Sequence, residues 1–159
     1  MKNISLLFGL LFVISCSNDS TDDITTPPGP DYEVWTGANI TFIKAPNTDA
    51  GDAANQDRIT SNVAITRGTS GGEIFNAVSE SDATENVSPR GTKWAVGNIE
   101  DVESLSFSSF RSAVGKPKNV VGKNLVMHIE ADNVYLSVKF LSWASSQSGG
   151  FSYERSTKD

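Results

Sequence analysis

The sequence predicts an all-β fold, a single antiparallel β-sandwich of jelly-roll-like layout behind a flexible N-terminal tether. Short apolar stretches alternate with polar residues at a period of two, which places one face of a strand on a core. Turn-forming residues separate these stretches at close spacing. The chain of 159 residues has no long amphipathic helix and no repeat of fixed period. A helical bundle, a solenoid and a propeller are therefore not expected.

The N-terminus has the pattern of a signal peptide. Lys2 is followed by an apolar run, Ile4 to Ile14, that is too short to span a bilayer as a stable helix. The residues around Cys16 resemble a bacterial lipobox, in which a small residue precedes a cysteine that receives diacylglycerol. Residues 1–15 are therefore expected to be a lipoprotein signal peptide, with Cys16 as the lipidated residue. A secreted protein with an incidental thiol is the alternative.

Residues 16–31 are predicted to be a lipid-anchored linker, acidic and rich in proline. The segment has almost no apolar side chains that could offset the entropy of ordering it. Its acidic cluster after Cys16 resembles the export signal of cell-surface lipoproteins in Bacteroidota, which implies display on the outer membrane; a merely solvated linker is the alternative. Asp19-Ser20-Thr21 resembles an O-glycosylation motif of that phylum, with Ser20 as the acceptor.

Residues 32–159 are predicted to form the sandwich domain. Its clearest part is a meander of three strands between Leu125 and Tyr153, with a turn at 131–133. We expect the core to assemble on this meander. Further strands are predicted at 38–45, 59–67, 74–78 and 92–97. Residues 102–114 are predicted to form a strand that passes into one helical turn.

Composition excludes several classes of function. A formal net charge of −6, with 13 scattered Lys and Arg residues, argues against nucleic-acid binding. A single cysteine excludes an intrachain disulfide, and a single histidine, His128, excludes a zinc site built from several Cys and His ligands.

One polar loop is the candidate metal site. It concentrates carboxylate and amide oxygens, which are the ligands that calcium prefers. The spacing differs from that of an EF-hand, and a solvated loop is the alternative. Calcium is the one cofactor that the sequence suggests, and its candidate ligands are Asp49, Asp52, Asn55 and Asp57.

Aromatic side chains are the candidate contacts for a ligand. Tyr135 and Trp143 are expected to share the face of their strand opposite the apolar one, and Trp94 lies in another strand. An exposed aromatic platform beside amide and carboxylate groups is typical of glycan-binding surfaces, whereas a core or rim position is the alternative. No catalytic residue is nominated, since the glutamates lie in polar, turn-rich segments without a feature that would keep one protonated.

Several segments of the domain resemble a domain of secreted and lipid-anchored bacterial proteins, and the resemblance extends from Gly37 onward. Among them are Gln56-Asp57-Arg58-Ile59-Thr60, Ile65-Thr66-Arg67 and Gly149-Gly150-Phe151-Ser152-Tyr153. That family has no assigned activity, so the resemblance implies an exported module and carries over no catalytic residue. It also implies a structural polar network of Asp57, Arg58 and Arg67.

The sequence thus favours a non-enzymatic lipoprotein of the outer membrane, held by its N-terminal lipid and exposed at the cell surface. Its domain is expected to be a binding or structural module for a glycan or an outer-membrane protein partner. The alternatives are a small carbohydrate-active or other hydrolytic enzyme and an accessory subunit of an outer-membrane complex. A concave pocket holding two carboxylates would favour the enzyme.

Overall fold

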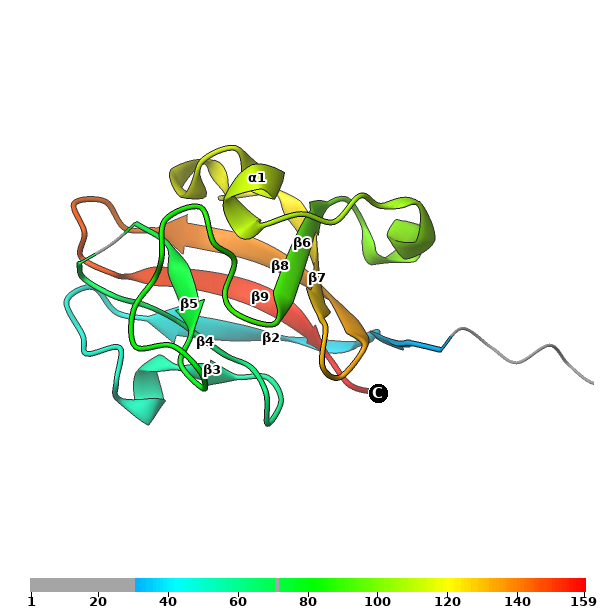
Figure 1. Ribbon diagram of the computed structural model, residues 1–159, viewed down its shortest axis with the longest axis horizontal. Helices are drawn as coiled ribbons and strands as arrows, with labels where there is room; N and C mark the ends of the chain where they lie inside the picture. Colours follow the sequence, from blue (N-terminus) through cyan, green and yellow to red (C-terminus); the bar gives the residue numbers. More distant parts are fainter. Residues whose placement is uncertain (1–30, 71) are drawn as a thin grey trace, which may run out of the picture.

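A computed structural model describes residues 31–70 and 72–159, and its fold is all-β, as the sequence predicts (Figure 1). The larger of two sheets has the strand order β2-β9-β8-β7-β6, with β1 pairing to β8 outside this order. Neighbouring strands of this sheet are antiparallel, except that β1 runs parallel to β8. Its strands are β1 (Glu33–Trp35), β2 (Gly37–Lys44), β6 (Thr92–Val96), β7 (Asn124–Ile129), β8 (Val134–Trp143) and β9 (Phe151–Thr157).

The second sheet is smaller and has the order β3-β4-β5. It consists of β3 (Asp57–Arg58), β4 (Ala64–Arg67) and β5 (Ile74–Asn76). The helical segments are short: η1 (Ala53–Asn55), η2 (Ile99–Ser104), α1 (Phe110–Val114) and η3 (Pro117–Asn119). Within the described residues, no helix is long and apolar enough to cross a membrane.

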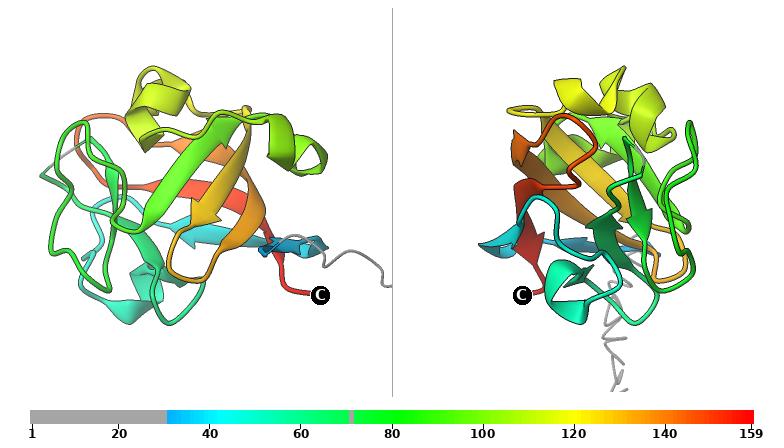
Figure 2. Two further views of the ribbon diagram at one scale, coloured as in Figure 1. Left: turned by 45° about the vertical axis from the view of Figure 1, so that its right-hand side comes forward. Right: turned by 90° about the vertical axis from the view of Figure 1, so that its left-hand side faces the viewer.

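The core lies between the two sheets. Figures 1 and 2 show the small sheet on one side of the large one, with α1 beside it. Ile65 and Ile74 of the small sheet and Phe110 of α1 belong to the same buried cluster as the apolar face of the meander. That face is formed by Leu125, Met127, Ile129, Val134, Leu136, Val138 and Phe140, so the predicted meander and its role in the core are confirmed.

A bulge in β8 changes which way Trp143 points. Phe140 pairs with Tyr153, but the next paired residue is Ser142, so Leu141 is extra. One extra residue reverses the alternation of faces. Trp143 then pairs with Phe151 and packs against the core, so the expectation that Tyr135 and Trp143 share the outer face is corrected.

Two other expectations are corrected in detail. Of the strand predicted at 59–67, only β4 (Ala64–Arg67) is a strand. Residues 59–63 form the turn of a β3–β4 hairpin, closed by bonds from the Ile59 and Thr60 amides to the Val63 carbonyl. Polar turn formers between Thr60 and Val63 account for the break. Within 102–114 the helical turn is α1, whereas the strand reduces to a single bridge between Ser108 and Trp94.

Candidate functional site

Asp57 lies in the core rather than in the polar loop. Its Oδ2 accepts hydrogen bonds from Tyr153 Oη and Arg155 Nε, both at 2.7 Å, and its Oδ1 accepts from Arg155 Nη2 at 3.0 Å. A bidentate pair of this kind is strong and directional. Both carboxylate oxygens are therefore occupied, and Asp57 has a structural role in place of the predicted calcium ligation.

The Asp57 contacts also set the charge states around it. Burial raises the pKa of Tyr153 well above its usual value, and the adjacent Asp57 charge raises it further. Burial alone would lower the pKa of Arg155, but the hydrogen bonds and charge of Asp57 outweigh it and raise that pKa. The charges of Asp57 and Arg155 thus compensate each other in the core, and Tyr153 donates a further hydrogen bond to Asp57.

The other candidate calcium ligands cap turns of their own loop. Asp49 accepts from the Gly51 amide at 2.8 Å, Asp52 accepts from the Ala54 amide at 3.0 Å, and Asn55 donates to the Asp49 carbonyl at 2.8 Å. In the part of the chain that the structure describes, no three His, Cys, Asp or Glu side chains are grouped so that they could hold a metal ion. The predicted calcium cluster is not assembled.

Trp94 is not available to a ligand. Its side chain is fully buried, its ring lies 5.1 Å from that of Phe110, and its Nε1 donates to Thr92 Oγ1 at 3.0 Å. An indole with its polar atom satisfied inside the core is a packing element. The prediction that Trp94 contacts a ligand is therefore wrong, and Trp94 is a core residue.

Trp143 is half-buried and covered by a cation. The Arg67 guanidinium lies over the indole at 4.1 Å from the ring centroid, which is a cation–π contact. Phe110 stacks on the same indole with centroids 6.1 Å apart. Trp143 therefore does not offer the open platform that the sequence predicts.

The polar network implied by the family resemblance is not formed. Arg58 is exposed, while Arg67 donates to the carbonyls of Ala144 and Gly150. The partner of Asp57 is Arg155, 98 residues further along the chain.

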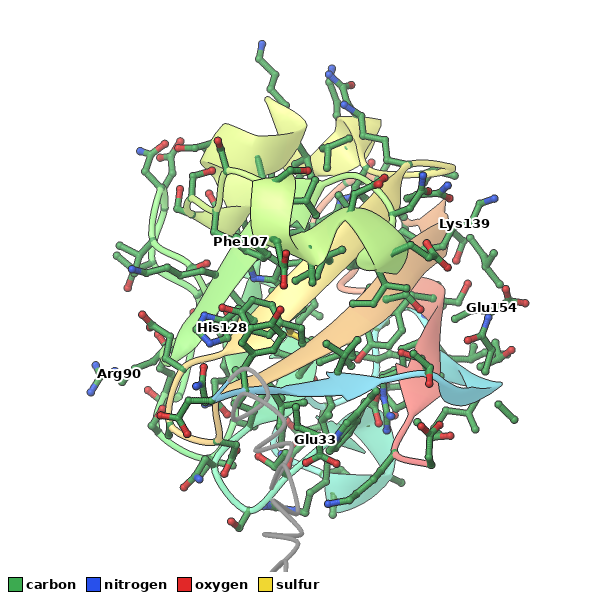
Figure 3. The ribbon with its side chains drawn as sticks, turned by 90° about the vertical axis from the view of Figure 1, so that its right-hand side faces the viewer. Glu33, Arg90, Phe107, His128, Lys139 and Glu154 are labelled. Carbon is green, nitrogen blue, oxygen red and sulfur yellow. The ribbon has the colours of Figure 1, made fainter. Side chains whose placement is uncertain are left out.

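Tyr135 lies in an aromatic patch on the outer face of the large sheet. Figure 3 labels two other members of this patch, Phe107 and His128. We define the aromatic patch as Tyr32, Phe107, His128 and Tyr135, all half-buried. His128 stacks on Tyr135 with centroids 4.2 Å apart and planes 3° apart, and Tyr32 and Phe107 meet Tyr135 edge-on at 5.2 and 5.4 Å. A hollow of about 210 Å³ adjoins the patch and is lined by Tyr32, Phe107, Tyr135, Val102, Glu103 and Leu105.

The segment around η2 forms a ridge across this face. It packs on β7 and β8, and Val126, on the outer side of β7, is fully buried. Leu105 fits against Gly97, where an added Cβ would lie 2.4 Å from Leu105 Cδ2. Because Gly97 has a φ of 154° and no side chain, the chain can turn and bring the ridge close to the sheet.

A polar groove lies on the other side of the ridge. It arises where β9 separates from β8, a gap that Ser156 Oγ bridges by accepting a hydrogen bond from the Ser137 amide at 3.0 Å. The groove has a volume of about 340 Å³. We call it the outer groove, and its polar lining includes Asn39, Asn98, Asn124, Ser137, Lys139 and Glu154.

The outer groove carries both charges and amides. Lys139 and Glu154 are direct cross-strand neighbours, and among the described residues neither forms an ion pair. Asn124 Nδ2 donates to Asn98 Oδ1 at 2.9 Å, which orients both amides at the groove wall.

On the patch side of the ridge, Tyr32 donates to Glu103 Oε1 at 3.0 Å, and this bond raises the pKa of Tyr32. Donors and acceptors thus flank the ridge on both sides.

The hollow beside Arg111 holds two carboxylates, those of Glu73 and Glu85, and both contact the same cation. Glu73 Oε1 accepts from Arg111 Nε at 2.5 Å, and Glu85 Oε1 lies 3.4 Å from Arg111 Nη2. Arg111 therefore joins these two carboxylates in one ion-pair cluster. The outer groove also holds two carboxylates, those of Glu100 and Glu154, so a hydrolytic enzyme remains the alternative hypothesis.

Sequence reasoning identified Tyr135 but missed Phe107 and Glu154 and treated His128 as scaffold. A partial signal exists for His128, because its position alternates with Met127 and Ile129 and so points outward. Phe107 and Glu154 reach the site only through the fold of η2 and the register of β9. Cys16 and Ser20, the predicted lipidation and glycosylation sites, lie outside the described residues.

Comparison with known proteins gives no relative from which a role could be transferred. Set against protein families, curated proteins and solved structures, the chain matches none of them.

Proposed function

We propose that the protein is a non-enzymatic surface lipoprotein whose domain binds a glycan across the outer face of its large sheet. The observation that carries this proposal is the pairing of the aromatic patch with the outer groove on one exposed face (Figure 3). Sugars present apolar ring faces and polar edges together. The patch supplies the first kind of contact, and the groove supplies the second.

The dimensions and chemistry of the two hollows support the glycan. A volume of about 340 Å³ falls in the range of small-molecule sites, and the hollow of about 210 Å³ lies across η2 from it. Tyr135 has few rotatable bonds and is already packed by its neighbours, so ordering it on binding costs little entropy. A linear glycan that crosses the ridge would contact both hollows.

The anchor in this proposal rests on the sequence. Lys2, the apolar run before Cys16 and the acidic residues after it resemble a Bacteroidota surface lipoprotein. A glycan-binding domain held by lipid on the outer membrane would meet polysaccharides outside the cell.

A glycan-array screen of the purified protein, with and without calcium, identifies the ligand class, and calorimetry on the best hit tests the site. We expect Tyr135→Ala and Lys139→Ala each to weaken binding about 10-fold, equivalent to about 1.4 kcal/mol. Tyr135→Ala removes the centre of the patch, while Lys139 is exposed, so its replacement leaves the fold intact.

Arg58→Ala is the matched control, since Arg58 is exposed on the small sheet. Thermal unfolding of each variant separates lost binding from lost folding. Unchanged affinity in both outer-face variants, or an equal loss in Arg58→Ala, would show that the glycan binds elsewhere.

A further inference from the structure

Arg67 is a buried cation without a counter-charge. Its side chain is only 3% exposed, its Nη1 donates to the carbonyls of Ala144 and Gly150 at 2.9 Å, and its Nε has no hydrogen-bond partner. None of the ion pairs formed within residues 31–70 and 72–159 includes Arg67. Burial lowers the pKa of Arg67 to about 10, so the group is charged at neutral pH yet poorly solvated.

A pocket of about 340 Å³ lies against this cation. We call it the Trp143 pocket; its lining includes Arg67, Arg111, Lys116, Pro117, Lys118 and Trp143. None of the described residues that line it is an aspartate or a glutamate. Arg111 is neutralised by Glu73 and Glu85, which leaves three cations in a chain whose formal net charge is −6.

We infer that the Trp143 pocket binds a carboxylate-bearing ligand the size of one sugar unit. A carboxylate is the anion that a guanidinium pairs with most directionally, and it would compensate the buried charge of Arg67. Exposed Lys116 and Lys118 would attract the anion. Trp143 and Pro117 give the pocket an apolar side that suits a ring.

This site is separate from the outer face. The pocket includes the loop between β8 and β9, whereas the aromatic patch adjoins η2, and Figure 1 places that loop and η2 at opposite ends of the molecule. The inference therefore goes beyond the proposed function, and the two can fail independently.

The test titrates the purified protein with D-galacturonate, using D-galactose as the neutral control and following tryptophan fluorescence. Trp35 and Trp94 are buried, so a change reports on Trp143. We expect galacturonate to bind at least about 10-fold more tightly than galactose, and Lys116→Ala/Lys118→Ala to weaken it about 10-fold. Arg67→Gln should abolish binding, and the lysine variant keeps the test valid if Arg67→Gln does not fold.

Lys139→Ala and Tyr135→Ala are the controls, and both should keep galacturonate affinity even where they lose glycan binding. A galacturonate trimer distinguishes the source of the carboxylate: tighter binding of the trimer assigns the pocket to an acidic glycan, and equal binding assigns it to the free sugar acid. Equal affinity for galactose, full affinity in the lysine variant, or inorganic sulfate binding as tightly as galacturonate would overturn the inference.

Discussion

Individual buried polar residues determine how the two layers meet. Asp57 of the small sheet binds Tyr153 and Arg155 of β9, and so joins the two sheets through one carboxylate. Lys44, also buried, donates to the carbonyl and hydroxyl of Thr48. Such groups are stable in a core only when they are paired, so each one fixes a local geometry.

The ionisation of Tyr153 makes the joint between the sheets sensitive to pH. The pKa of Tyr153 is raised in the folded state, whereas it is about 10 in the unfolded chain. The folded state therefore holds this proton more tightly, and its contribution to stability is complete below pH 10 and is lost as the pH rises through the folded-state pKa. Arg67 acts in the opposite direction. Burial lowers its pKa to about 10, so its contribution makes stability rise as the pH increases above about 10.

A comparison with Tyr153→Phe isolates the Tyr153 contribution. We expect the wild type to be more stable at pH 7 by about 1–2 kcal/mol, the value of a buried hydrogen bond to a carboxylate. The difference should shrink above pH 10, as measured by urea unfolding of both proteins from pH 7 to 11. A difference that stays constant, or grows, across that range would contradict the assignment.

At the scale of elements, the sequence predicts strands well where alternation alone decides them. The run from Val134 to Phe140 alternates cleanly and forms most of β8. The bulge at Leu141 depends on how β8 pairs with β9, which no local pattern reveals. The ridge of η2 is likewise unpredicted, because its position depends on the contact between Gly97 and Leu105.

The contact between Gly97 and Leu105 predicts a compensating pair of mutations. Gly97→Ala places a Cβ where Leu105 Cδ2 lies and strains a backbone with positive φ. We expect it to cost about 1–3 kcal/mol of stability, as overpacking does, and to weaken glycan binding by displacing the ridge. Leu105→Ala in the same chain should recover part of both losses, measured by urea unfolding and calorimetry.

A double-mutant cycle provides the control for that prediction. Leu105→Ala alone measures the cost of removing the side chain from the ridge. If the two losses simply add, then the contact does not hold the ridge, and the outer groove owes its shape to another part of the fold.

For the whole molecule, the fold class is more predictable than the candidate site. Alternation and turn signals predict a sandwich because each strand needs only one buried face. The site requires residues from distant strands in register: Lys139 and Glu154 meet only when β8 pairs with β9. Tyr32, just before β1, contacts Tyr135 of the aromatic patch, so the patch lies where the described chain enters the large sheet.

Cys16→Ala tests the proposed anchor of the whole molecule. A thiol is the group that accepts diacylglycerol in a lipobox, so we expect the variant to lose incorporation of labelled palmitate and to leave the membrane fraction. Each acyl methylene contributes about 0.8 kcal/mol to membrane binding, so losing the chains removes most of the affinity. Ser17→Ala, one residue away, is the matched control and should keep the label. Continued labelling of Cys16→Ala would refute the lipid anchor and leave glycan binding at the outer face as a separate question.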